Sequence, residues 1–313
     1  MKPVIHVAVA VIKNKQNQYL IAKRLKHVHQ GGLWEFPGGK VEVGETTLEA
    51  LTRELQEEVA IELQTARPFI QIKHHYEDRS VLLDVWLVTE FSGQAEGREG
   101  QAIAWRPIEA LTPEKFPQAN LPIIKAIRLP DYYMITPETD DIFMLLDTLE
   151  NNFRKGIQLV QLRMKTISSE KYRVLANQVL ELAHTYQAKV LTNSDNPVQL
   201  DSILFSGVHL SHQSLWALTN RPLPNHQWVA ASCHSEEDLA RAYQIGVDFA
   251  VLSPVLKTAS HPTAVPLGWE QFTSLVKNTS LPTYALGGLQ THQLTTAHSH
   301  GAQGIAGITT FID

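Results

Sequence analysis

The second half of the sequence repeats one pattern, a short apolar segment followed by a segment with helical periodicity. The eight apolar segments span residues 132–136, 157–163, 189–193, 207–210, 228–232, 248–252, 282–286 and 304–308. Segments with helical periodicity lie between most of them, at 141–155, 169–187, 235–245, 269–278 and 291–299. Strands that alternate with helices in this number predict a compact (β/α)₈ barrel, and an open doubly wound sheet is the alternative.

The first half follows a different rhythm. Two β-rich runs, 4–11 and 18–23, flank a polar turn and predict a hairpin. An amphipathic helix is predicted over 47–58, with Thr46 or Thr47 as its cap and with an apolar face made of Leu48, Leu51 and Leu55. Further strands are predicted at 69–74, 81–89 and 102–106. We therefore expect an α+β domain over 1–128 and a barrel domain over 131–313.

Composition limits what such a chain can do. It has 313 residues and a net charge of −5, which argues against binding to duplex nucleic acid. Cys233 is the only cysteine, so the chain can form neither an internal disulfide nor a CxxC zinc site. The apolar run at 4–11 is too short to span a membrane, and no small-residue cleavage site follows it. We expect a cytoplasmic protein that does not associate with membranes.

Three carboxylates share one face of the predicted helix. Glu54, Glu57 and Glu58 are spaced i, i+3 and i+4. Like charges so close together repel one another unless a hard cation neutralises them, and Mg²⁺ binds through carboxylates together with substrate phosphates. Arg53 stands one residue outside this face and can orient a glutamate through a bidentate pair. For the ExxEE run taken alone, a solvated acidic helix face is the alternative.

The full spacing around these glutamates resembles the Nudix box of diphosphate hydrolases, G-x5-E-x7-R-E-U-x-E-E-x-G-U, where U is a bulky apolar residue. The chain matches the box at Gly39, Glu45, Arg53, Glu54, Leu55, Glu57, Glu58 and Ile61. Ala60 stands where the box has glycine. If that position requires a positive φ angle, the alanine costs on the order of 1 kcal/mol. The resemblance implies a site for Mg²⁺, or for Mn²⁺ in its place.

The flanking segments narrow the resemblance to the MutT type, the 8-oxo-dGTP diphosphatases, over about residues 4–128. The segment 33–40 is similar to that subfamily's approach to the box, and 99–101 to its EGQ segment. The glutamate of that segment, here Glu99, joins the metal site or acts as the base. The implied metal ligands are Gly39, Glu54, Glu57, Glu58 and Glu99, and the implied substrate-binding residues are Arg24, Phe36, Lys40, Asp78, Arg79 and Asn120.

In this resemblance Phe36 packs on the purine, and Asn120, within an FPxAN segment, hydrogen-bonds the oxidised guanine edge. An asparagine suits that role because its amide both donates and accepts. Taken singly, these residues have structural alternatives: a core aromatic for Phe36 and a loop cap for Asn120.

The implied reaction is metal-assisted attack of water on a nucleotide diphosphate linkage, with a glutamate as base. Its substrate would be a nucleoside triphosphate, 8-oxo-dGTP, and its products the monophosphate and pyrophosphate. That activity would serve nucleotide-pool sanitation, DNA repair and the fidelity of DNA replication. The alternative is a thiamine-pathway protein whose Nudix part hydrolyses thiamine or pyrimidine diphosphates.

Residues 132–308 resemble thiamine-phosphate synthase and its thiazole-tautomerase relative. The matching segments are YYMIT, QLRMK, GVHL, SCH, SPV and ALGGL, at 132–136, 161–165, 207–210, 232–234, 253–255 and 285–289. Repeated glycines near the last two strands suit a phosphate site built from backbone N–H groups. The resemblance implies that a thiamine-related or other phosphate ligand contacts Arg163, Lys165, Asn193, His234, Gly287 and Gly288.

Two departures weaken this second resemblance. Ser194 and Ser214 stand where the family has metal-binding aspartates, and Asp195 comes one residue late. The loss of two hard-cation ligands argues against full synthase activity. A degenerate barrel that binds or senses a ligand is favoured. Retained synthase activity, or a metal-free tautomerase-like reaction with His234 as acid/base, are the alternatives.

Overall fold

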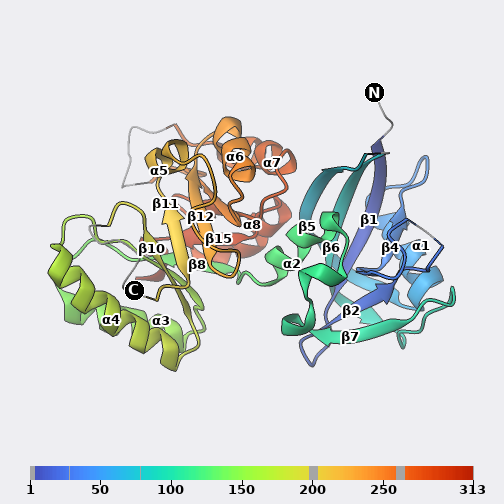
Figure 1. Cartoon of the computed structure of the whole chain (residues 1–313), viewed down its shortest axis with the longest axis horizontal. Helices are drawn as coiled ribbons and strands as arrows, with labels where there is room; N and C mark the ends of the chain where they lie inside the picture. The colour runs from blue at the N-terminus through green and yellow to red at the C-terminus, as the bar shows by residue number, and fades with distance from the viewer. Residues whose placement is uncertain (1–3, 28, 78, 197–203, 259–264, 313) are drawn as a thin grey trace. The chain divides into compact units, whose positions relative to one another are not determined.

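In the computed structural model, the chain forms two compact units, Met1–Arg128 and Leu129–Asp313 (Figure 1). The structure describes residues 4–27, 29–77, 79–196, 204–258 and 265–312. Each unit has its own hydrophobic core. Among the described helices, none is long and apolar enough to cross a membrane.

The N-terminal unit combines two sheets with one long helix. Its elements are β1 (Val4–Ile12), β2 (Gln18–Lys23), β3 (Trp34–Glu35), β4 (Gly38–Lys40), α1 (Thr47–Val59), β5 (Glu62–His75), β6 (Ser80–Ser92), β7 (Ile103–Pro107) and α2 (Leu121–Ile127), with 3₁₀ turns at Ile108–Ala110, Pro113–Lys115 and Gln118–Asn120. One sheet has the order β4-β1-β6-β5 and the other β3-β2-β7. In the first sheet β1 is parallel to β6 and antiparallel to β4.

The predicted hairpin of the first two strands is wrong. A tight turn joins them, closed by the Asn14 N–H that donates to the Gln18 carbonyl over 2.9 Å, and they share one bridge between Lys13 and Tyr19. Beyond this bridge they enter different sheets, because both edges of β1 are occupied by β4 and β6. The alternating side chains of β1 therefore serve two cores, one under α1 and one behind the sheet.

Helix α1 begins where its sequence predicts. Thr46 is the cap, and it forms a capping box with Glu49. The buried face consists of Ala50, Leu51, Leu55 and Val59. Leu48, predicted to belong to this face, is 40% exposed, because it lies in the first turn at its edge. The helix ends at Ala60, whose φ of 59° and ψ of 27° are left-handed.

The C-terminal unit is a closed barrel of eight parallel strands, which confirms the barrel and excludes the doubly wound sheet. Its strands are β8 (Tyr132–Ile135), β9 (Leu159–Leu162), β10 (Lys189–Asn193), β11 (Gly207–Leu210), β12 (Trp228–Cys233), β13 (Phe249–Leu252), β14 (Thr283–Leu286) and β15 (Gly304–Gly307). Around them lie the helices α3 (Ile142–Arg154), α4 (Ser169–Thr185), α5 (His212–Ala217), α6 (Glu236–Gln244), α7 (Gly268–Lys277) and α8 (Leu294–Ser299), as Figure 1 shows. The short helix α5 was not predicted, and the predicted helix over 291–299 divides into a 3₁₀ turn and α8.

Candidate functional site

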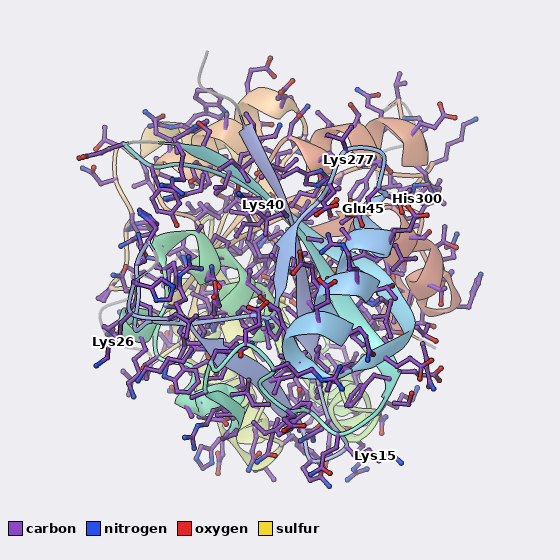
Figure 2. The ribbon with its side chains drawn as sticks, turned by 90° about the vertical axis from the view of Figure 1, so that its right-hand side faces the viewer. Lys15, Lys26, Lys40, Glu45, Lys277 and His300 are labelled. Carbon is purple, nitrogen blue, oxygen red and sulfur yellow. The ribbon has the colours of Figure 1, made fainter. Side chains whose placement is uncertain are left out.

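Arg53 holds the carboxylates on and before helix α1 in place. Its guanidinium forms a bidentate pair with Glu45, both distances being 2.9 Å, and donates to Glu54 over 2.8 Å. A longer contact of 3.3 Å reaches Glu57, and Nη2 donates to the Lys40 carbonyl. The hydrogen bonds from Arg53 lower the pKa of Glu45 to about 2. One arginine thereby ties α1 to β4 and to the loop that carries Glu45, and Figure 2 labels Lys40 and Glu45 on these segments.

Glu58 lies deeper in the site than its neighbours. Its carboxylate accepts a hydrogen bond of 3.2 Å from the Gly38 N–H. Burial raises the pKa of Glu58 to about 8; the Gly38 hydrogen bond acts against this rise, and the charges of Glu54, Glu35 and Glu99 add to it. A buried carboxylate surrounded by other carboxylates is held in its charged form only if a cation compensates it.

The loop after β6 brings Glu99 towards this group by closing the C-terminal end of α1. The Arg98 N–H and the Gln101 side-chain amide both donate to the Glu58 carbonyl, over 2.9 and 3.0 Å. The Gln101 side chain also accepts from the Glu99 N–H over 2.8 Å. The first two bonds satisfy the Glu58 carbonyl, which the helix end leaves without a partner, and the third holds the backbone of Glu99 beside it.

The donors present fit a hard divalent cation in their chemistry, because they are carboxylate oxygens beside the backbone of Gly39. The Glu54 carboxylate lies against Gly39, where a Cβ atom would be 2.1 Å from its carboxyl carbon. As the side chains stand, no three Asp, Glu, His or Cys groups of the described residues are close enough together to hold a metal ion. The predicted ligand set is thus not assembled: Glu54 and Glu57 turn to Arg53, and Glu58 turns to Gly38.

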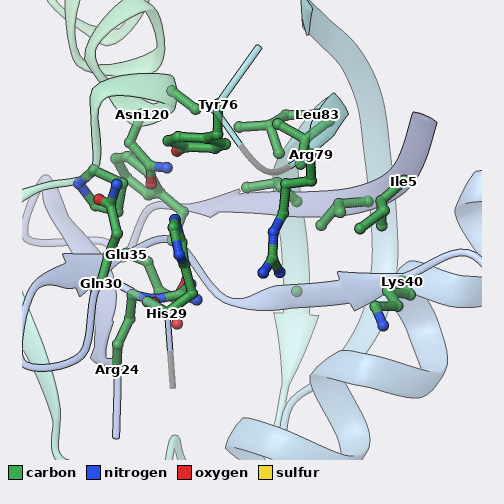
Figure 3. A pocket seen from close by; sticks show the side chains of 17 residues that line it. Ile5, Arg24, His29, Gln30, Glu35, Lys40, Tyr76, Arg79, Leu83 and Asn120 are labelled. Atoms are coloured by element: carbon green, nitrogen blue, oxygen red, sulfur yellow. The ribbon is translucent and has the colours of Figure 1, made fainter. Parts of the chain in front are cut away.

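A pocket of about 190 Å³ opens beside the box. It is lined by Ile5, Val7, Val9, Arg24, His29, Gln30, Glu35, Phe36, Gly38, Lys40, Tyr76, Arg79, Val81, Leu83, Pro117, Ala119 and Asn120. Figure 3 shows Asn120 and Tyr76 at one end, Lys40 at the other and Arg79 between them. Because Gly38 is both a wall of the pocket and the hydrogen-bond partner of Glu58, the pocket adjoins the carboxylates.

Two predicted base contacts lie in this pocket. Asn120 precedes α2 but makes no side-chain capping bond, so the loop-cap alternative does not describe it. The residue is only 8% exposed, and it lines the pocket. Phe36 also lines the pocket, although it is 3% exposed and stacks on Phe116 with ring centroids 5.8 Å apart. Phe36 is thus a core aromatic that presents little surface to a ligand.

The charged substrate residues are placed around the same pocket. Arg24 forms an ion pair with Glu35 and donates through Nε to the His29 carbonyl over 2.9 Å. Burial raises the pKa of Glu35, while Arg24 acts to lower it. Lys40 and Arg79 both line the pocket. Asp78 lies outside the described residues.

Four residues of this pocket were not predicted from the sequence: Glu35, His29, Gln30 and Tyr76. The His29 ring packs edge-on against Tyr76, with centroids 5.2 Å apart. Glu35 was visible as a charged residue inside an otherwise apolar WEF run. Gln30 gave no signal, since its position in a polar loop is unremarkable in the sequence.

At the mouth of the barrel, the two basic side chains predicted to contact a phosphate ligand form ion pairs with carboxylates of the chain. Lys165 Nζ lies 2.6 Å from Asp195, and Arg163 lies 3.9 Å from Glu138. Glu138 also accepts hydrogen bonds from the backbone N–H groups of Lys165 and Thr166. Burial acts to raise the pKa of Asp195, but the Lys165 interaction leaves it below its ordinary value.

Asn193 is the last residue of β10 and is buried. Its amide donates to Gln161 over 3.0 Å, and its oxygen accepts from the Asp195 N–H. From Gln161 a hydrogen-bonded chain continues through Tyr133 to His209, whose Nε2 lies 2.8 Å from Ser232 Oγ. Each end of the Asn193 amide has one partner, so a ligand would use its second N–H or the second lone pair of its oxygen.

The other predicted barrel residues follow strand ends. His234 lies after β12, with Nδ1 2.8 Å from the Ser253 carbonyl, so that Nε2 is the acceptor that remains. Gly287 and Gly288, after β14, have φ angles of +109° and +68°. A Cβ atom at Gly288 would lie 2.3 Å from the Lys257 carbonyl oxygen, so the turn requires glycine.

The barrel mouth does not fit the divalent cation that the resemblance implies. Ser194 Oγ accepts from the Ser211 N–H over 2.9 Å, and Ser214 forms the N-terminal cap bond of α5 with Ser211. The two serines at the aspartate positions are thus held by hydrogen bonds, and Asp195 is neutralised by Lys165. Hydroxyls in such a network are poor substitutes for the carboxylates that hard cations need.

Each of the two units is similar to a known protein family. A model of the thiamine monophosphate synthase family matches residues 132–311, and one of the NUDIX domain matches 8–126. The Aquifex aeolicus (strain VF5) protein named "Putative thiamine-phosphate synthase 2" is 36% identical over 188 residues, which are 60% of this chain and 100% of that protein. An 8-oxo-dGTP diphosphatase of Escherichia coli (strain K12) is 39% identical over 124 residues, 40% of this chain and 96% of that enzyme. A CTP pyrophosphohydrolase of the same organism is 38% identical over 119 residues, 38% of this chain and 87% of that enzyme.

The two matches fall on the two compact units and do not overlap. The box-bearing unit spans nearly the whole length of its diphosphatase relative, and the barrel match covers more than half of the chain. The chain therefore belongs to the thiamine monophosphate synthase family through its barrel, and its N-terminal domain is a Nudix hydrolase domain with MutT-type relatives.

Proposed function

We propose that the N-terminal domain hydrolyses 8-oxo-dGTP to the monophosphate and pyrophosphate, and so removes oxidised guanine nucleotides before replication. The observation that supports this most is the shared wall at Gly38. The same residue lines a base-sized pocket that contains the Asn120 amide and binds Glu58 of the carboxylate helix. A nucleotide with its base near Asn120 would therefore direct its phosphates towards the glutamates.

The roles of the residues follow from their positions. Glu54, Glu57 and Glu58, with the backbone of Gly39, would hold Mg²⁺, which when bound would neutralise the phosphate oxygens. Arg53 keeps Glu45 and Glu54 in place. Lys40 and Arg79 supply positive charge along the pocket, and Arg24 is paired there with Glu35. Glu99 is our proposed base for the attacking water, because it enters the site from a loop outside α1.

The test is release of pyrophosphate from 8-oxo-dGTP, dGTP and CTP in the presence of Mg²⁺. We expect the highest kcat/KM for 8-oxo-dGTP. Glu54→Gln should lower kcat at least a hundredfold, since it removes a charged ligand from the proposed metal site. The matched control is Glu114→Gln, at an exposed residue of a 3₁₀ turn. Equal turnover of 8-oxo-dGTP and dGTP, or turnover of CTP alone, would reject the proposed substrate.

The barrel is proposed to bind a thiamine-related phosphate or another phosphate ligand without catalysing the synthase reaction. Supporting this are the glycine turn at Gly287 and Gly288 and the hydrogen-bonded serines, Ser194 and Ser214, at the two aspartate positions of the family. We expect thiazole phosphate to raise the melting temperature of the barrel, as measured by differential scanning fluorimetry. We expect no product of the synthase reaction to form. Steady synthase turnover would contradict this proposal.

A second candidate function is a step in thiamine metabolism, with the Nudix domain acting on thiamine or pyrimidine diphosphates. The observation in its favour is the presence of both domains in one chain. Turnover of thiamine diphosphate with a higher kcat/KM than that of 8-oxo-dGTP would decide for this candidate.

A further inference from the structure

Gln30 occupies an unusual backbone conformation in the loop between β2 and β3. Its φ angle is +57°, in the left-handed region that side-chain-bearing residues other than asparagine and aspartate seldom adopt. The surrounding loop imposes this conformation. Arg24 N–H donates to the Leu33 carbonyl and Gly32 N–H to the Arg24 carbonyl, both over 2.9 Å. The direction of the Gln30 side chain is therefore set by the loop.

That direction takes the side chain into the pocket that also contains Asn120. Figure 3 shows the two amide ends on the same side of the pocket. Among the described residues, neither amide has a side-chain hydrogen-bond partner. A ligand that covers two such carboxamides excludes water from them, so it binds well only if it replaces the hydrogen bonds that water made.

We propose that Gln30 is a specificity-determining residue that hydrogen-bonds the nucleobase at a second position while Asn120 pairs with the first. This inference rests on the proposed nucleotide hydrolysis. A carboxamide offers a donor and an acceptor side by side and selects a base edge with the complementary pair. A pocket with two such groups favours a base large enough to reach both, which is a purine with exocyclic oxygen or amino groups.

The structure also separates this role from catalysis. Gln30 is a residue of the base pocket and takes no part in the hydrogen bonds that join Arg53 to Glu54 and Gly38 to Glu58. Loss of its amide should therefore weaken binding and selectivity, expressed in KM, and leave the chemical step expressed in kcat nearly unchanged.

The experiment measures kcat and KM of the full chain for 8-oxo-dGTP, dGTP and CTP. Gln30→Met keeps the length of the side chain and removes its hydrogen bonds. Gln30→Gly removes the side chain and accepts the left-handed backbone without strain. Gln16→Met, at an exposed residue of the first turn, is the matched control. We expect both Gln30 variants to raise KM for the preferred nucleotide about tenfold, the worth of one lost hydrogen bond, and to reduce its preference over the other two.

The inference would be overturned if, in both Gln30 variants, the ratios of kcat/KM among the three nucleotides stay as in the wild type. This includes the case in which kcat/KM falls by the same factor for all three. A wild-type chain that turns over none of them would instead refute the proposed nucleotide hydrolysis itself. Selectivity lost in Gln30→Met but kept in Gln30→Gly would show that the effect comes from the loop and would also overturn the role of the amide.

Discussion

Ala60 lowers the stability of the N-terminal domain through its backbone conformation. It ends α1 with a left-handed φ of 59°, the conformation that glycine adopts without a penalty. The methyl group adds steric cost in that region, so we predict that Ala60→Gly stabilises the N-terminal domain by about 0.5–1 kcal/mol. Urea unfolding followed by tryptophan fluorescence measures this gain. Ala102→Gly, at an exposed residue without a positive φ, should by contrast lose a few tenths of a kcal/mol.

His209 should make the stability of the barrel depend on pH. Burial lowers the pKa of His209 to about 3, against an ordinary value of 6.5. The folded chain keeps this histidine neutral while the unfolded chain takes up a proton below pH 6.5, so stability falls as the pH decreases from 6.5 towards 3. The loss between pH 7 and pH 5 should be about 2 kcal/mol.

The measurement is the free energy of unfolding of the barrel at several pH values, in the wild type and in His209→Gln. The difference between the two chains isolates this residue, since all other titrating groups are shared. We expect the variant to be less stable at pH 7, because its contacts with Tyr133 and Ser232 are disturbed, but to lose less on acidification. Parallel pH profiles would show that His209 is not the group responsible.

At the scale of elements, the loop after β6 acts as a cap for α1. The Gln101 side chain links the Glu58 carbonyl to the Glu99 N–H. We predict that Gln101→Ala lowers kcat for pyrophosphate release about tenfold, because Glu99 loses its fixed position, while stability falls by only about 1 kcal/mol. Gln118→Ala, at an exposed residue, is the control. A proportional loss of folded protein and activity would mean that the loop serves stability alone.

Elements could be predicted from the sequence where local signals coincide. The cap and the apolar spacing of α1 are encoded within its own segment, so the helix was placed within one residue. The pairing of β1 could not be predicted from local signals. Its partners β4 and β6 lie far along the chain, and the short polar turn to β2 is compatible with a hairpin and with two strands that part.

The same distinction applies to the candidate site. The spacing of Glu54, Glu57 and Glu58 placed them on one face because helical geometry is periodic. The pocket joins segments from β1, the loop before β3, β6 and the turn before α2, so its membership depends on tertiary packing. Residues without a motif, such as Gln30 and Tyr76, could therefore not be found. The pairing of Lys165 with Asp195 escaped prediction for the same reason.

At the scale of the whole molecule, the two units have separate cores, and each carries its candidate site within its own residues. Separate cores predict two unfolding transitions in calorimetry rather than one. Gly288→Ala should lower the melting temperature of one transition only, because a Cβ atom there would collide with the Lys257 carbonyl in the barrel. Mg²⁺ with a non-hydrolysable nucleotide should raise only the other.

The same variant then tests whether hydrolysis depends on the barrel. We expect Gly288→Ala to leave kcat and KM for pyrophosphate release within a factor of two of wild type at temperatures below both transitions. A single transition that shifts with the glycine variant and also with the nucleotide would show that the two cores unfold as one cooperative unit. Hydrolysis that weakens in step with the barrel's stability would likewise mean that the Nudix site needs an intact barrel to work.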